Sequence, residues 1–141
     1  MNRILVALVL ASAPAACSYG MTAEKFRPAT DPHGVMARIT TDGGELRGEV
    51  IELHDAGLVI FSSRIGQTDE RTLRLVPYAA VRTSKFEQLD SRYAIRDGSA
   101  PTGDVRERLR LVSRFPHGMA AAVLAELLKA NGQTQLAGIE P

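Results

Sequence analysis

The stretch "TTDGGELRGEVIELHDAGLVIF", residues 40–61, contains the clearest strand and turn signals in the chain. The Asp-Gly pair at 42–43 is a favoured hairpin dipeptide, because the tight turn needs a positive φ. Gly48 interrupts the apolar alternation of the second strand, and a glycine inside a strand often marks a bulge or a sharp bend. A second turn signal at 55–57 precedes an apolar strand at 58–62. This stretch therefore predicts bent antiparallel strands joined by tight turns.

Apolar alternation extends on both sides of this stretch. Residues 35–40 alternate between apolar and polar side chains, which is the period of a half-buried strand. Residues 72–76 alternate in the same way, and Pro77, which has no amide proton, should end that strand or place it at a sheet edge. Further strand candidates are residues 81–89 and 91–95. The pattern predicts a small bent-strand β-barrel over residues 35–97.

The C-terminal segment changes to a helical pattern, so the predicted fold class is mainly β with C-terminal α. Asp104 and Glu107 have the spacing of a capping box and predict a helix start. The apolar residues of 105–115 fit a helix or a strand, and both remain open, whereas 119–130, "MAAAVLAELLKA", predicts a helix. We expect one or two helices within 104–132 to cap the barrel, since an uncovered sheet edge invites pairing with other chains.

The first sixteen residues have the layout of a secretory signal peptide. Arg3 gives a positive start, residues 4–11 form an unbroken apolar run, and residues 12–16 are small or proline. As a helix this run covers about 12 Å, whereas a bilayer core is about 30 Å thick, so it is too short to span a membrane. We therefore expect residues 1–16 to be removed on export. The alternative is a buried N-terminal helix or strand.

Cys17, the only cysteine, follows this leader. Residues 14–17, Pro-Ala-Ala-Cys, resemble the lipobox of bacterial lipoproteins, in which the cysteine becomes the lipidated first residue of the mature chain. Pro14 departs from that pattern, where a Leu-like residue is usual. The resemblance implies a stable membrane anchor through two or more acyl chains, and Ser18, in place of Asp, implies the outer membrane. The alternative is cleavage after Ala15, which leaves a soluble secreted or periplasmic protein with a free thiol.

The strand pattern also resembles known small barrels. Residues 35–61, with their glycine-bent second strand, resemble the first half of an Sm-like barrel. "LRLVPYAAVR" at 73–82 resembles the closing part of PRC-barrel and Src-homology-type barrels, where a strand leads into a proline and a short turn. The resemblance does not extend to an RNA site. The Sm family has an Asn shortly after the acidic residue that matches Asp55, but residues 56–59 contain none, and the later Arg-Gly pair has no counterpart at 76–82.

The charge balance also argues against a nucleic-acid partner. The chain has 17 basic and 16 acidic residues, and loss of the leader removes Arg3, which leaves the mature chain formally neutral. Nucleic-acid-binding domains usually have a pI above about 9, whereas the pI of this chain is about 8.0. We therefore expect no nucleic-acid partner.

No arrangement typical of catalysis is recognisable in the sequence. The three histidines, at 33, 54 and 117, lack the close spacing of common zinc motifs. A Gly-x-Ser-x-Gly elbow and a phosphate-binding glycine-rich loop are also missing. Glu49 and Glu52 would point to opposite sides of an ideal strand, so they do not predict a paired-carboxylate site. We predict no catalytic residue, no metal site and no cofactor.

Three arginines are candidates for contact with a membrane surface. If the segment after Asp104 is helical, Arg106, Arg110 and Arg114 line one side of it. Near anionic headgroups each would contribute about 1 kcal/mol of binding free energy. The alternative is an ordinary solvated face.

These patterns together predict an exported, lipid-anchored protein of the bacterial cell envelope. Residues 17–34 would form a flexible tether, and the folded domain would act as a non-catalytic binding or assembly module. Its partners would be the membrane and an envelope protein that the sequence does not identify. Two alternatives remain: a cytoplasmic Sm-like RNA-binding protein, and an exported enzyme whose functional residues converge only in the fold.

Overall fold

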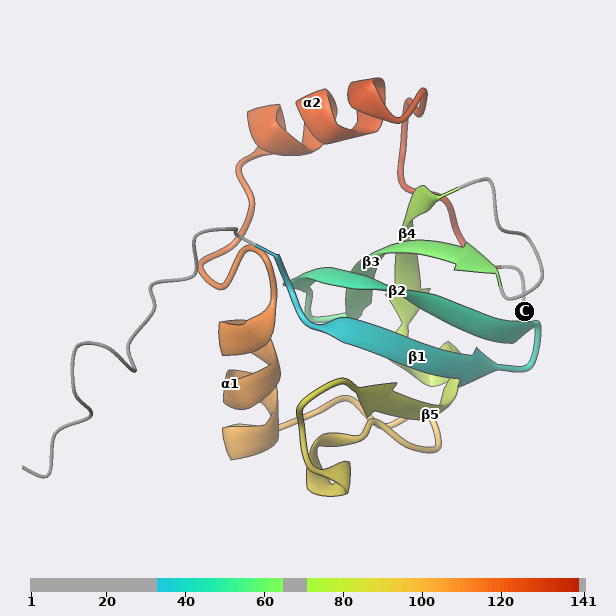
Figure 1. Ribbon diagram of the computed structural model, residues 1–141, viewed down its shortest axis with the longest axis vertical. Helices are drawn as coiled ribbons and strands as arrows, with labels where there is room; N and C mark the ends of the chain where they lie inside the picture. Colours follow the sequence, from blue (N-terminus) through green and yellow to red (C-terminus); the bar gives the residue numbers. More distant parts are fainter. Residues whose placement is uncertain (1–32, 65–70, 140–141) are drawn as a thin grey trace, which may run out of the picture. The chain divides into compact units, whose positions relative to one another are not determined.

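The computed structural model describes residues 33–64 and 71–139; the predicted leader, Cys17 and residues 18–32 of the predicted tether lie outside them. The described residues form a mainly β domain with two helices at its C-terminal end (Figure 1), which confirms the predicted fold class. The strands are β1 (Met36–Thr41), β2 (Gly44–Leu53), β3 (Gly57–Arg64), β4 (Thr72–Pro77) and β5 (Val81–Phe86). The helices are the 3-10 turns η1 (Tyr78–Ala80) and η2 (Ser91–Tyr93) and the α-helices α1 (Gly103–Val112) and α2 (Ala121–Ala130).

The strands form one antiparallel sheet in the order β4-β3-β2-β1-β5. The sheet bends round an apolar interior without closing, because its two end strands, β4 and β5, do not pair with each other in the described part of the chain. The barrel expected from the sequence is therefore an open one. The strand, proline and short turn implied by the resemblance are present, since β4 ends at Pro77 and η1 follows it.

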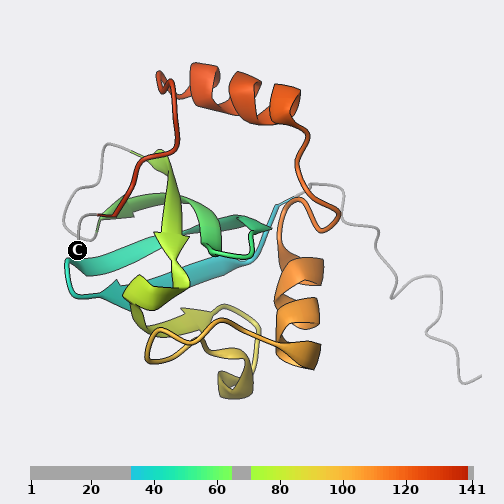
Figure 2. The ribbon, with the colours of Figure 1, turned by 180° about the vertical axis from the view of Figure 1, so that it is seen from behind.

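The open edge of β4 is occupied by the C-terminal segment of the domain, which runs beside it (Figure 2). The amide of Leu75 donates to the carbonyl of Ala137 (3.0 Å), and the amide of Ala137 donates to the carbonyl of Leu73 (2.9 Å). The side-chain amide of Gln133 extends this pairing, because its oxygen accepts from the amide of Leu73 (2.8 Å) and its nitrogen donates to the carbonyl of the same residue (3.1 Å). An edge that is already hydrogen-bonded is no longer a template for another strand.

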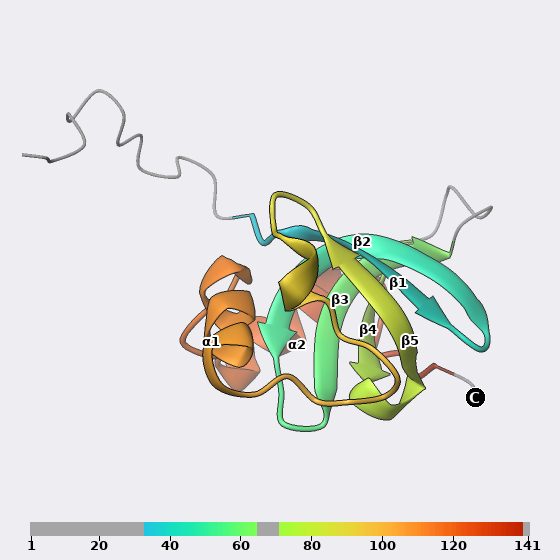
Figure 3. The same cartoon turned by 90° about the horizontal axis from the view of Figure 1, so that it is seen from below.

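The open edge of β5 is occupied by the segment that follows η2 (Figure 3). The amide of Asp97 donates to the carbonyl of Arg82 (3.0 Å), and the amide of Ile95 donates to the hydroxyl of Ser84 (2.7 Å). The strand predicted at 91–95 is therefore wrong: the chain makes the turn η2 and then this edge segment. Asp97, with a φ of +50°, leaves the strand region of backbone space, and the amide of Gly98 makes the next hydrogen bond to β5, to the carbonyl of Val81 (2.8 Å).

A bulge in β2 determines which side chains face the interior. The sequence places a bend or bulge at Gly48, but the register against β3 shifts just after Val50, and Gly48 pairs regularly with both neighbouring strands. Gly48 instead permits close approach of the strands, because a Cβ there would lie 2.3 Å from the carbonyl oxygen of Phe61. Val50 and Ile51 lie in different apolar clusters, as adjacent strand residues do, and the bulge returns Leu53 to the side of Val50.

Two apolar clusters lie on opposite faces of the sheet, and successive residues of β3 alternate between them. The buried residues of the inner cluster are Ala37, Ile39, Leu46, Val50, Leu58, Ile60, Val76, Tyr78, Val81, Phe86, Ile95 and Leu109. Those of the outer cluster are Ile51, Val59, Leu73 and Leu128. Since Leu109 belongs to α1 and Leu128 to α2, each helix covers a different side of the sheet. The helices therefore cap the domain as predicted.

The helix boundaries differ from the predicted ones at three places. The segment 105–115, open between helix and strand, begins as α1, but its N-cap is Thr102, and Asp104 lies within the first turn. Ser113 has an extended backbone and ends the helix, so Arg114 lies outside it. α2 begins two residues later than predicted, and it ends as predicted, with Gly132 at a φ of +67°.

Candidate functional site

The connector between α1 and α2 is docked on the bulge of β2. The amide of Arg114 donates to the carbonyl of Val50 (3.0 Å), and the amide of Phe115 donates to the carbonyl of Ile51 (2.9 Å). A bulge takes a residue out of regular pairing, so its carbonyls are available to a third segment. The sequence predicts a bulge at Gly48 and not at this position. The carbonyls exposed by the bulge after Val50 therefore hold the helical segment on the sheet.

Glu49 binds two segments beside this bulge. Its carboxylate accepts from the amide of Gly34 (2.7 Å) and lies 3.6 Å from the guanidinium of Arg114. His33 is also close, with Nδ1 at 3.9 Å from the carboxylate. Only 12% of the Glu49 side chain is exposed. The hydrogen bond from the Gly34 amide is charge-assisted and therefore strong, and the guanidinium of Arg114 adds an ion pair to it. Gly34, which the sequence predicts to be part of the tether, is buried here and held on β2 by its hydrogen bond to Glu49.

Glu52 binds the far end of the same connector. Its carboxylate accepts from the amide of Met119 (3.0 Å) and contacts Nε2 of His54 (2.9 Å). The sequence predicts opposite directions for Glu49 and Glu52, which holds for an ideal strand; the bulge between them changes that alternation. Each carboxylate therefore accepts a hydrogen bond from a backbone amide outside β2. The sequence did contain one sign of the bulge. Val50 and Ile51 are adjacent apolar residues between two glutamates, which interrupts a strict alternation of apolar and polar side chains.

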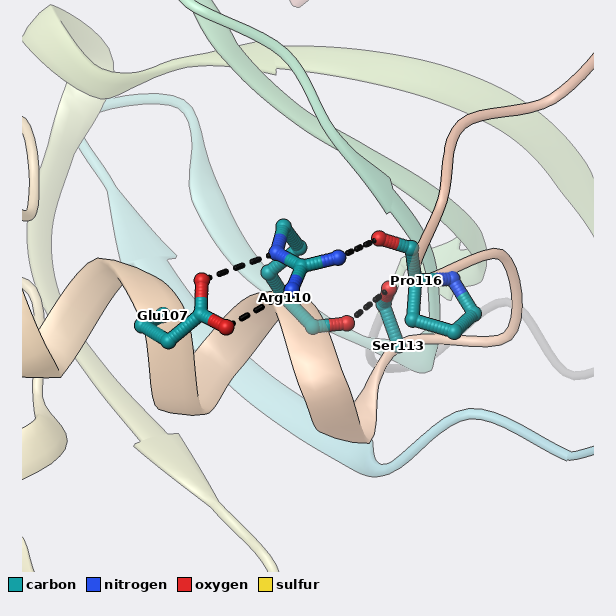
Figure 4. A network of polar contacts seen from close by, with 4 residues as sticks. All are labelled: Glu107, Arg110, Ser113 and Pro116. Carbon is teal, nitrogen blue, oxygen red and sulfur yellow. Dashed lines mark hydrogen bonds and ion pairs between the residues drawn. The ribbon is translucent and has the colours of Figure 1, made fainter.

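Two of the three candidate arginines lie on α1, and both are ion-paired. Arg106 binds the carboxylate of Asp55 in the β2–β3 turn (2.7 Å). Arg110 binds Glu107 one turn earlier (2.7 Å) and also donates to the carbonyl of Pro116, which fastens the helix end to the connector (Figure 4). The hydrogen bonds from Arg110 lower the pKa of the Glu107 carboxyl, which stays charged.

The third candidate, Arg114, does not share a helix face with the other two. It follows the end of α1 and pairs with Glu49. The predicted row of three arginines along one helix is therefore wrong, because the chain leaves the helix at Ser113. The structure unites these arginines with carboxylates rather than with one another.

Tyr78 holds the β2–β3 turn from the inner cluster. Its side chain is buried, and its hydroxyl donates to the carbonyl of His54 (3.0 Å). Burial raises the pKa of this phenol above the ordinary value, because a phenolate would lose its hydration, and the nearby guanidinium of Arg106 offsets only part of the effect. The folded state therefore prefers the neutral phenol.

We expect an alkaline titration of the folded protein, followed by phenolate absorbance, to show one tyrosine whose pKa is raised above the ordinary value of a phenol. Tyr78→Phe should remove that step, and Tyr93→Phe should retain it. The pKa of the Tyr78 phenol is higher in the folded state than in the unfolded state. Its contribution to the free energy of unfolding is therefore complete below about pH 10 and is lost as the pH rises through the folded pKa. The urea midpoint of the parent should consequently fall more steeply over that range than that of Tyr78→Phe. An absorbance change that is complete for every tyrosine near pH 10 would contradict this assignment.

A hollow of about 440 Å³ lies between the start of β1, the turn after β5 and the exposed side of α1. Its volume is in the range of small-ligand sites, which is about 300–1,000 Å³. Both apolar and polar residues line it, and one of them is Leu111, which is 50% exposed. The hollow thus offers an apolar contact on the surface of the domain.

No family model, curated protein or solved structure matches this chain. Within residues 33–64 and 71–139, no three His, Cys, Asp or Glu side chains are grouped so that they could hold a metal ion. The helices found in the same residues are all too short or too polar to cross a bilayer.

Proposed function

We propose that this chain is an exported protein of the bacterial cell envelope, held on a membrane by acyl chains on Cys17, and that its β domain is a non-catalytic binding or assembly module. The observation that carries the proposal is the leader of residues 1–16, which ends in two alanines directly before the single cysteine. Two or more acyl chains at that position would hold the domain stably on a bilayer.

The geometry around the β2 bulge supports a binding role for the domain. The carboxylates of Glu49 and Glu52 accept from backbone amides of other segments, and Arg106 joins α1 to the β2–β3 turn. These ionisable groups fix the arrangement of segments, so they contribute rigidity. A rigid surface loses little conformational entropy when a partner binds, and the hollow beside Leu111 is a suitable place for a partner's apolar side chain.

The test of the proposal is the intact mass of the protein purified from membranes of cells that express the full chain. We expect a chain that begins at Cys17 and carries acyl chains, because lipobox processing removes residues 1–16 and modifies the cysteine. Metabolic labelling with palmitate should mark the same species. Cys17→Ser should abolish the label and leave the protein outside the lipid-anchored fraction.

Two results would overturn the proposal. A soluble protein that begins after Ala15, with an unmodified thiol, would be an ordinary secreted protein. A cytosolic protein that still begins at Met1 would have no export signal, and specific, salt-dependent binding of uridine-rich RNA by that form would support the Sm-like alternative.

A further inference from the structure

Three cations lie in one row across β2, β1 and β5. Arg38 is directly opposite Arg47 on one side and Lys85 on the other. All three side chains are exposed, whereas their strand neighbours Ala37 and Phe86 are buried in the inner cluster. The row therefore lies on the outer face of these strands. In Figure 1 neither helix crosses β1 or β2.

The next cross-strand row adds a fourth cation. Arg96 stands opposite Thr83 on the segment that pairs with the edge of β5, and both residues are exposed. Two carboxylates neutralise part of this positive charge. Glu45 forms an ion pair with Arg38 (3.0 Å), and Glu87 forms one with Arg47 (3.1 Å). Their pairing leaves Lys85 and Arg96 without an ion pair to any residue that the structure describes. This face, which we call the cationic face (Arg38, Arg47, Lys85 and Arg96), has four cations and two carboxylates.

Like charges directly opposite each other destabilise a sheet. In the row Arg47–Arg38–Lys85, the ion pairs with Glu45 and Glu87 offset the repulsion at the two arginines, and the charge of Lys85 is not offset by an ion pair within the described residues. An anionic partner would offset this repulsion. Lys85 and Arg96 differ in this respect from Arg106, Arg110 and Arg114, because each of these three is already paired with a carboxylate.

We propose that the cationic face docks on anionic phospholipid headgroups. The inference rests on the proposed function, because lipidation of Cys17 would place the domain beside a bilayer. Sixteen residue steps separate Cys17 from His33, and an extended chain of that length reaches at most about 55 Å. Such a tether permits contact through any face of the domain, so surface charge determines which face meets the lipid.

The experiment uses residues 17–141 with Cys17→Ser, which is the mature chain without its acyl chains. Residues 31–141 form one compact unit, so removal of residues 1–16 leaves that unit whole. The probe is sedimentation with vesicles of phosphatidylcholine alone or mixed with phosphatidylglycerol, at low and at physiological salt. We expect binding only to the mixed vesicles, and we expect Lys85→Glu with Arg96→Glu to weaken it about tenfold or more at low salt.

The matched control is Lys129→Glu with Arg108→Glu. It changes the net charge by the same amount at two exposed helix positions that have no ion pair in the described residues. Binding of the control should stay close to that of the parent. An equal loss in both variants would show that only net charge matters and would overturn the proposal, as would equal binding to vesicles without phosphatidylglycerol. Tighter, variant-sensitive binding of a single-stranded oligonucleotide would assign the face to nucleic acid instead.

The two proposals fail separately. Vesicle binding by the unacylated chain does not depend on the mass of the native protein. A lipidated native protein whose unacylated form ignores anionic vesicles would keep the anchor and reject the cationic face. A non-lipidated native protein that still binds anionic vesicles through Lys85 and Arg96 would reject the anchor and keep the face.

Discussion

Gly48→Ala is expected to cost about 3 kcal/mol or more of the free energy of unfolding, at the upper end of what overpacking does. A Cβ at this position would lie 2.3 Å from the carbonyl oxygen of Phe61 and 2.6 Å from the Cβ of Ser62. Both obstacles belong to the adjacent strand, so neither can move without displacing β3. Since Gly48 pairs with β1 and β3 at once, the displacement would spread across the sheet. Urea denaturation followed by far-ultraviolet circular dichroism measures the loss.

Gly138→Ala is the matched control for this change. Nothing lies within 4 Å of a Cβ placed there, and its φ is not in the left-handed region. Its effect should stay within about 0.5 kcal/mol, as for most exposed substitutions. Equal unfolding midpoints for Gly48→Ala and the parent would refute the close approach of β2 and β3.

Local signals predicted the strands and turns well. The Asp-Gly pair at 42–43 forms the hairpin between β1 and β2, and the positive φ that the turn requires falls on Gly44, at +121°. Alternating apolar residues placed β1, β3 and β4 within two residues, because their inner faces are continuously buried. The Asn131–Gly132 stop was equally local. Each of these features depends on residues that are close in sequence.

The features that failed depend on contacts between distant segments. A strand at 91–95 was plausible from its apolar residues, but the edge of β5 already has its partner in the segment that follows. The bulge after Val50 is fixed by the connector that docks on it, more than sixty residues later. Neither partner has a period that marks it in the sequence.

The candidate site was predictable only in part. Arg106 and Arg110 do lie on one helix, as their spacing indicates, but the carboxylate that pairs with Arg106 belongs to a turn 51 residues away. A sequence shows which charges a helix carries and not which of them a neighbouring element neutralises. The cationic face, in contrast, is not indicated by any local spacing, because only the cross-strand register brings Arg38, Arg47 and Lys85 together. That register cannot be read before the sheet order is known.

Leu128→Asp is expected to detach α2 while the inner cluster stays folded. Leu128 is 8% exposed and is the residue of α2 that is buried in the outer cluster, against Ile51, Val59 and Leu73. An aspartate there would leave an unpaired carboxylate on an apolar surface, at a cost that exceeds the about 2–5 kcal/mol of a truncation to alanine. Release of the helix limits that cost. No residue of α2 is in the inner cluster, which keeps its own buried side chains.

Hydrogen exchange measured by mass spectrometry resolves the two regions. Amides of residues 121–130 should exchange close to the rate of an unfolded peptide in Leu128→Asp, while those of β1 and β5 keep their protection. Val123→Asp is the matched control on the same helix, because Val123 is 39% exposed and a carboxylate there stays hydrated. Uniform loss of protection would show that the two clusters unfold as one unit. Unchanged protection of α2 would show that Leu128 does not hold the helix, and either result would contradict the division of the domain into an inner and an outer core.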